Sequence, residues 1–241
     1  MSHKLTISAK GLGELALPDF CPRCFWIKLK VGNKLPFQIF PGVFSSIDSY
    51  SKHLVISWFE RHKGPPIWLE GLGYITDYTK SPHYSKFYIM DKATDITLRG
   101  SPDIIFNKKD GSYIIADFKT AKYTQKQDEL LPMYETQLNA YALIGSQQGI
   151  SPVSSLALIY TEPVTDETAT ARDDHHHETG FIMGFSAHIE QVALNPGSVQ
   201  ALLTKTREIY ELATIPPYTD GCKNCQCLEG LLEIVRESSD D

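Results

Sequence analysis

Apolar residues recur at helical spacing in several segments of the chain. Over residues 45–62, one face of the expected helix carries Ile47, Tyr50, Leu54, Trp58 and Phe59. The same period predicts helices over residues 130–144 and 196–212. A further helix is expected over about residues 9–31, with Ser8 as its N-cap and two prolines that interrupt it.

Runs of strand length alternate with these helices. Residues 96–100 lead into a strand at residues 103–106, and a second strand follows at residues 113–118. The sequence Asn-Lys-Lys-Asp-Gly between these two strands predicts a hairpin turn. Residues 153–160 form an apolar run that we expect to be buried on both faces, and residues 181–189 form the last predicted strand. The order hairpin, helix, strand, strand, helix predicts an α/β fold.

Two segments follow neither period. Residues 67–92 are aromatic and irregular, and residues 162–180 are predicted to form a long polar loop. This loop contains Asp-Asp-His-His-His-Glu at residues 173–178, but consecutive loop residues do not converge easily on one ion. We therefore expect a solvated loop tip rather than a metal site.

The composition is that of a globular protein. The length allows one large domain or two small ones, and we assign residues 1–241 to a single domain. Of the 241 residues, 42% are hydrophobic and 22% are charged, which excludes a wholly disordered, collagen-like or coiled-coil chain. No run approaches the about 18 apolar residues of a membrane span, and the N-terminus lacks the apolar region of a signal peptide. We expect a cytoplasmic protein with no membrane partner. The net charge of -6 argues against a globally basic nucleic-acid coat protein but allows a local basic groove.

Two acids and a lysine are expected to meet at one end of the hairpin. Asp103 follows Gly100 at the start of one strand, and Asp117 ends the other strand. An antiparallel hairpin places the start of one strand beside the end of its partner. Asp117 and Lys119 are two residues apart, so they point to the same face of the strand.

This combination fits metal-dependent phosphodiester chemistry. The carboxylates of Asp103 and Asp117, with the backbone carbonyl of Phe118, would form a hard oxygen site suited to Mg²⁺ or Mn²⁺. Such an ion binds a phosphate oxygen and activates water. Lys119 would orient that water or stabilise the charge that develops on the phosphate. The alternative for this pattern taken alone is a hairpin with ordinary surface charges.

The helix after the hairpin supplies polar residues for the same pocket. Gln137 and Tyr141 are four positions apart and share one helical face. We expect Gln137 to bond a catalytic water or Lys119, and Tyr141 to reach a phosphate; a half-buried polar helix face is the alternative. Lys122 and Lys126, just beyond the strand, are expected to contact a DNA backbone.

The five cysteines lie at the two ends of the chain. Cys21 and Cys24 form one C-x-x-C pair, Cys222 and Cys225 form a second, and Cys227 follows. In a cytoplasmic chain such cysteines are not expected to form disulfides. Two pairs of this kind typically close a tetrahedral zinc site, which would join the N-terminal helix to the C-terminal tail.

Taken together, these motifs resemble the PD-(D/E)XK nuclease superfamily, and within it the RecB-like exonucleases, including the CRISPR-associated ones. The family pattern has an acid from a helix, then G-x-x-D, (D/E)-x-K and Q-x-x-x-Y, matched here by residues 100–103, 117–119 and 137–141. Many RecB-like members also carry C-P-R before aromatic residues, as at residues 21–26, and a C-terminal C-x-x-C. The resemblance implies a restriction-endonuclease-like core, a mixed central sheet flanked by helices, over about residues 96–190.

The resemblance leaves two sets of ligands open. The family's first motif places a His or Glu on an early helix, for which His53 and Asp48 are the candidates; they are five residues apart and do not share a helical face well. Relatives often hold an iron–sulfur cluster through one N-terminal and three C-terminal cysteines. Here Cys227 would have to be the third C-terminal ligand, and its tight spacing favours zinc bound by the two pairs.

We therefore expect a Mg²⁺- or Mn²⁺-dependent deoxyribonuclease, an exonuclease acting on single strands or DNA ends. DNA is the expected partner, and a CRISPR-adaptation or repair complex is the expected setting. The alternative is a nucleic-acid-binding or assembly subunit that keeps the nuclease fold with little catalysis. A phosphohydrolase acting on small nucleotides is a third and weaker hypothesis.

Overall fold

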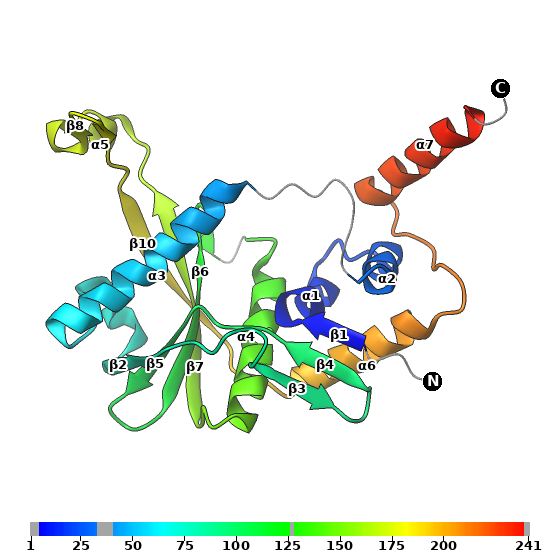
Figure 1. Cartoon of the computed structure of the whole chain (residues 1–241), viewed down its shortest axis with the longest axis horizontal. Helices are drawn as coiled ribbons and strands as arrows, with labels where there is room; N and C mark the ends of the chain where they lie inside the picture. Colours follow the sequence, from blue (N-terminus) through cyan, green and yellow to red (C-terminus); the bar gives the residue numbers. More distant parts are fainter. Residues whose placement is uncertain (1–4, 33–40, 126–127, 239–241) are drawn as a thin grey trace.

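The centre of the molecule is a five-stranded sheet. A computed structural model describes residues 5–32, 41–125 and 128–238. In this sheet the strands run in the order β10-β7-β6-β5-β2 (Figure 1). Their bounds are β2 (Ile75–Thr79), β5 (Ile104–Lys108), β6 (Tyr113–Lys119), β7 (Val153–Pro163) and β10 (Phe185–Val192). Strands β6 and β7 are parallel and the other neighbours are antiparallel, which confirms the predicted mixed central sheet.

Helices cover both faces of this sheet (Figure 1). On one face, α3 (Gly42–His62) packs Phe59 into a buried cluster that includes Ile114 of β6. On the other face, α4 (Leu131–Gln147) connects β6 to its parallel neighbour β7 and packs in the cluster that includes Ile115. Because successive side chains of a strand point to opposite faces, the β6 residues divide between these two cores.

The chain also forms a second, three-stranded sheet that the sequence analysis did not predict. It contains β1 (Leu5–Ser8), β3 (Tyr88–Asp91) and β4 (Ile96–Arg99), in the order β1-β4-β3. The run at residues 96–100 therefore does not lead into β5, because β4 and β5 belong to different sheets. Strand β1 is four residues long and pairs in parallel with β4, far along the chain. Such a short, non-local pairing leaves no periodic signal in the sequence.

The N-terminal region is more divided than the single interrupted helix expected over residues 9–31. It contains α1 (Ala9–Gly13), the 3-10 turn η1 (Glu14–Ala16) and α2 (Pro22–Lys30). Ser8 caps α1 as predicted, because its side chain accepts a hydrogen bond from Gly11 N at 2.9 Å. Residues 67–92 are less irregular than expected, since they contain the 3-10 helix η2 (Ile67–Leu72) as well as β2 and β3.

Two segments project away from the sheets at opposite sides of the molecule (Figure 1). Between β7 and β10, where a polar loop was expected, the chain forms α5 (Glu167–Thr170), η4 (Asp173–His175), β8 (His176–His177) and β9 (Gly180–Phe181). The last predicted helix is confirmed as α6 (Ser198–Glu211), and α7 (Lys223–Glu237) is the second projecting segment. None of the helices in the described ranges is both long and apolar enough to cross a membrane.

Candidate active site and cysteine cluster

The hairpin of β5 and β6 places the two predicted acids beside each other. Its register pairs Ile104 with Ala116, so the next opposed residues are Asp103 and Asp117. The backbone N–H of Phe118 donates to Oδ2 of Asp103 at 2.8 Å. The N–H and C=O of one residue in an extended strand point to the same edge, so the Phe118 carbonyl also faces the side of Asp103.

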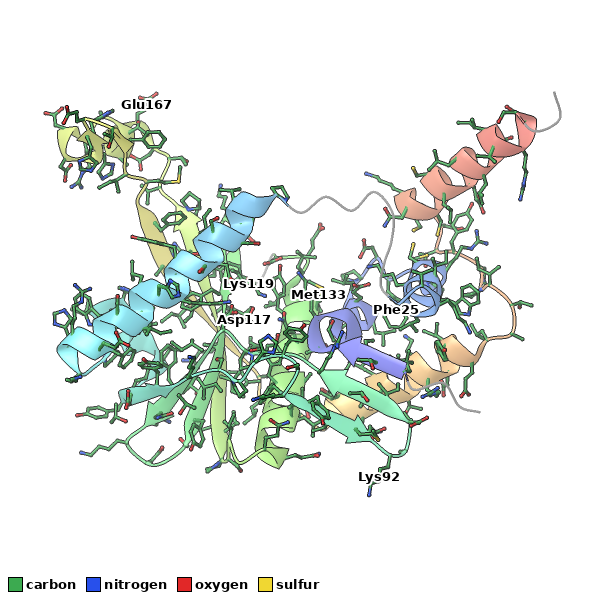
Figure 2. The ribbon with its side chains drawn as sticks, viewed as in Figure 1. Phe25, Lys92, Asp117, Lys119, Met133 and Glu167 are labelled. Carbon is green, nitrogen blue, oxygen red and sulfur yellow. The ribbon has the colours of Figure 1, made fainter. Side chains whose placement is uncertain are left out.

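Asp117 and Lys119 form a direct ion pair at the end of β6. Nζ of Lys119 lies 2.6 Å from Oδ2 of Asp117, whose side chain is 7% exposed. The same ammonium lies 4.0 Å from the centre of the Tyr134 ring and 3.3 Å from Oε1 of Gln137. Asp117 and Lys119 lie at the end of the sheet, between α3 and α4 (Figure 2). The predicted convergence of an acid, an amine and the α4 amide is therefore present.

Helix α4 extends this chain of contacts into the core. Nε2 of Gln137 donates to Oη of Tyr141 at 2.7 Å, and both side chains are buried. Burial and the charge of Asp117 raise the pKa of Tyr141 far above its usual range, so its hydroxyl stays protonated. Tyr141 is only 5% exposed, and its hydroxyl contacts Gln137. The expected contact of Tyr141 with a phosphate stays a prediction.

Helix α3 contributes two charged residues, one of which the sequence analysis missed. Nζ of Lys52 lies 2.6 Å from Oδ1 of Asp103 and 2.7 Å from Oδ2 of Asp48. Asp48 and Lys52 are four residues apart and so share one helical face, a spacing in the sequence that could have drawn attention to Lys52. His53 is exposed. Of the two first-motif candidates, the contacts connect Asp48 to the acid pair, through Lys52.

The electrostatics of the site follow from burial and from the closeness of like charges. Burial and the negative charge of Asp117 raise the pKa of Asp103 to about 7, against the lowering effect of Lys52. Lys10 of α1 is also affected by the charges of this site. Desolvation and the positive charge of Lys119 lower the pKa of Lys10. The sequence did not indicate that Lys10 belongs to this site. Its place depends on the three-stranded sheet, which brings α1 close to Lys119 and was not predicted.

The donor atoms present suit a hard divalent cation. Asp103, Asp117 and the Phe118 carbonyl offer oxygen atoms, which are the ligands that Mg²⁺ and Mn²⁺ prefer. Lys122 is exposed in the segment after β6, and Lys126 lies outside the described residues. The expected DNA contacts of these two lysines stay predictions.

Four cysteines from the two ends of the chain form a compact cluster. The sulfur atoms of Cys21, Cys24, Cys222 and Cys225 all lie within 4.8 Å of one another. The shortest separations are 3.4 Å for Cys24 to Cys225, 3.5 Å for Cys24 to Cys222 and 3.7 Å for Cys21 to Cys225. Cys227 is exposed and does not belong to this cluster. The prediction that the two C-x-x-C pairs join the terminal segments is confirmed.

Charged and aromatic contacts reinforce the junction at the cysteine cluster. Arg23 lies between the two N-terminal cysteines in sequence, and its Nη1 is 2.6 Å from Oε1 of Glu229 on α7. Its Nε donates to the carbonyl of Pro216 at 3.0 Å, and its guanidinium lies 4.5 Å from the centre of the Tyr218 ring. These contacts hold α2 against the chain that leads into α7.

The cysteine thiols differ in acidity because their neighbours differ. Burial acts to raise the pKa of Cys21, but backbone hydrogen bonds from Cys24 and Thr219 lower it to about 7. Burial raises the pKa of Cys225 to about 11. Four thiolates this close repel one another, so a bound cation is what would allow all of them to ionise together.

A mixed sheet flanked by helices, with two acids and a lysine on one hairpin, defines a nuclease-type α/β domain. The family model described as "PD-(D/E)XK nuclease superfamily" matches residues 49–229 of this chain. The chain therefore belongs to the PD-(D/E)XK nuclease superfamily. A solved structure described as "Crystal structure of SSO0001" is similar to this chain, with 12% sequence identity and a TM-score of 0.42. The similarity covers 87% of this chain and 78% of the chain in that structure. No curated protein matches the chain.

Proposed function

We propose that this protein is a Mg²⁺- or Mn²⁺-dependent deoxyribonuclease of the RecB-like group, acting as an exonuclease on single strands or DNA ends. The observation that supports a nuclease is the pair of acids next to Phe118. Asp117 precedes Phe118 in β6, and Asp103 accepts a hydrogen bond from its N–H, while Lys119 lies 2.6 Å from Asp117. The cysteine pairs at the two ends of the chain support the RecB-like group.

Each residue of the site has a role that its contacts support. Asp103, Asp117 and the Phe118 carbonyl would hold the divalent ion, which supplies a Lewis acid for phosphate and water when it is bound. Lys119 would orient the attacking water or stabilise negative charge on the phosphate, because its ammonium is fixed by Asp117 and Gln137.

A cleavage assay on end-labelled DNA tests this function. Linear single strands, linear duplexes and closed circular single strands would each be incubated with Mg²⁺, Mn²⁺ or EDTA. We expect metal-dependent cleavage of the linear substrates and no cleavage of the circles, because an exonuclease requires an end. Cleavage that persists in EDTA would refute the proposal. Binding of DNA without cleavage would favour the alternative, an assembly subunit.

Lys119→Ala identifies the site that performs the cleavage. We expect a loss of about 10²- to 10⁴-fold in rate, the range usual for a group that assists proton transfer. Lys92→Ala is the matched control, because Lys92 is exposed at a turn far from Asp117 and Lys119 (Figure 2). Equal activity of Lys119→Ala and Lys92→Ala would show that the cleaving site lies elsewhere.

We also propose that the cysteine cluster binds zinc. Zinc–sulfur bonds of about 2.3 Å in a tetrahedron place the sulfur atoms about 3.8 Å apart, and the three shortest sulfur–sulfur separations, 3.4–3.7 Å, are close to that value. An iron–sulfur cluster would place its own iron and sulfide between the thiolates and hold them further apart. The four-cysteine arrangement without Cys227 also supports zinc.

A further inference from the structure

Lys52 lies between two carboxylates at the place where a divalent ion would have to bind. Its ammonium contacts Oδ1 of Asp103 and Oδ2 of Asp48, at 2.6 and 2.7 Å. Its side chain is 29% exposed and that of Asp103 is 14% exposed, so water screens this pair only in part. The other oxygen of Asp103 accepts the N–H of Phe118. Both oxygens of a predicted metal ligand therefore already have cationic or N–H partners.

A metal ion and Lys52 would repel each other here. Two cations that contact the same carboxylate lie only a few ångström apart, and their repulsion is strong in a partly buried site. A lysine side chain has a flexible four-carbon stem, so its ammonium can leave one partner without movement of the backbone. Asp48, at the same helical face, gives Lys52 a second anchor on α3.

We propose that Lys52 has two roles in turn: it holds Asp48 and Asp103 together before the metal binds, and then it gives up Oδ1 of Asp103 to the metal and contacts the substrate phosphate. This inference rests on the proposed nuclease function, because it requires that Asp103 binds a divalent ion. It assigns Lys52 two effects of opposite sign, weaker metal binding and stronger substrate binding.

Direct titration with Mn²⁺ tests the first effect without any need for catalysis. The free ion would be followed by electron paramagnetic resonance at pH 8, with the full-length, zinc-loaded protein. We expect Lys52→Met to bind Mn²⁺ about tenfold more tightly than wild type, since one charge at this range shifts a neighbouring equilibrium by about one to three orders of magnitude. Lys52→Arg, which keeps the charge, and Lys92→Met, which removes a distant charge, should bind like wild type.

Steady-state cleavage at saturating Mn²⁺ tests the second effect. We expect Lys52→Met to raise the KM for DNA and Lys52→Arg to restore it in part. A merely structural role would instead lower the melting temperature and weaken metal binding together. Equal or weaker Mn²⁺ binding by a folded Lys52→Met variant overturns the proposal.

The failure of this inference can be distinguished from the failure of the nuclease assignment. Asp117→Asn should abolish Mn²⁺ binding if the ion occupies the proposed site. If wild type and Asp117→Asn bind Mn²⁺ equally, the metal site is elsewhere and the proposed function itself is wrong. If Asp117→Asn loses the ion but Lys52→Met does not gain affinity, only the role of Lys52 is wrong.

Discussion

Gly100 and Tyr141 are in such close contact that a side chain at position 100 has no room. A Cβ atom built on Gly100 would lie 2.3 Å from Cε1 of Tyr141. The glycine of the G-x-x-D motif therefore fits against the tyrosine of the Q-x-x-x-Y motif. Gln137 connects this contact to Lys119, because its amide bonds both the Tyr141 hydroxyl and the Lys119 ammonium.

Gly100→Ala should consequently damage both stability and catalysis. We expect a loss of about 1–3 kcal/mol in the free energy of unfolding, the usual cost of overpacking a core. Displacement of Tyr141 should also lower kcat. Urea denaturation and the cleavage assay measure these two effects. Gly230→Ala is the control, because a Cβ there meets nothing within 4 Å and alanine favours the helix; a similar loss in both variants would contradict the packing argument.

Gln137 is the link between Lys119 and Tyr141, so its removal should affect the active site more than an ordinary buried substitution. Gln137→Leu removes the hydrogen bond that the amide donates to the Tyr141 hydroxyl, at a cost of about 1–3 kcal/mol. A small displacement of Lys119 is enough to lower kcat by about 10²-fold. Single-turnover cleavage at saturating metal measures this loss.

Gln147→Leu provides the comparison for Gln137→Leu, because Gln147 lies on the same helix and is exposed. It should leave kcat unchanged. Wild-type kcat in the Gln137→Leu variant would show that the contact with Lys119 has no part in catalysis. Tyr141→Phe should have a smaller effect than Gln137→Leu, since Lys119 keeps its contact with the amide.

The parts of the site that the sequence predicted are those built from local geometry. Asp103 and Asp117 meet because a hairpin has only one register that buries its apolar residues. Gln137 reaches Lys119 because α4 connects β6 to its parallel neighbour β7 and packs against the sheet. The two C-x-x-C pairs were recognisable because cysteine spacing is characteristic of metal sites.

The parts that the sequence did not predict depend on contacts between distant segments. Lys52 reaches Asp103 through a long side chain from α3, which covers the face of the sheet opposite to α4. Helical periodicity in the sequence does not predict such a contact. Strand β1 pairs with β4 far along the chain, and this pairing brings Lys10 near Lys119. The burial of Tyr141 likewise depends on its close contact with Gly100, which lies directly after strand β4 of the small sheet.

The cysteine cluster should hold about one zinc ion per chain and contribute directly to stability. Cys24→Ser is expected to lose the zinc and to lower Tm by about 5–15 °C, since about 1 kcal/mol shifts the Tm of a domain of this size by about 2–4 °C. Elemental analysis and thermal unfolding measure both effects. Cys227→Ser should keep the zinc and the Tm, because Cys227 is exposed and outside the cluster. Iron with visible absorbance in the purified wild type would refute zinc.

Asp103 gives the metal-free protein a stability that depends on pH. Its folded-state pKa is raised to about 7 by burial and by Asp117, whereas an unfolded Asp titrates near 3.8. Between these two values the folded protein binds a proton that the unfolded chain has lost. The stabilisation by protonated Asp103 is therefore fully present below about pH 4 and is lost as the pH rises through about 7.

Asp103→Asn removes this titration and so provides the test. With no Mg²⁺ or Mn²⁺ added, we expect the stability of Asp103→Asn relative to wild type to increase as the pH is raised from 5 to 8, because only wild type acquires the buried charge. Urea denaturation at each pH measures the difference. Addition of Mg²⁺ at pH 8 should reverse the order, since the ion stabilises wild type alone. A difference between the two proteins that does not change with pH would show that Asp103 is already ionised well below pH 7.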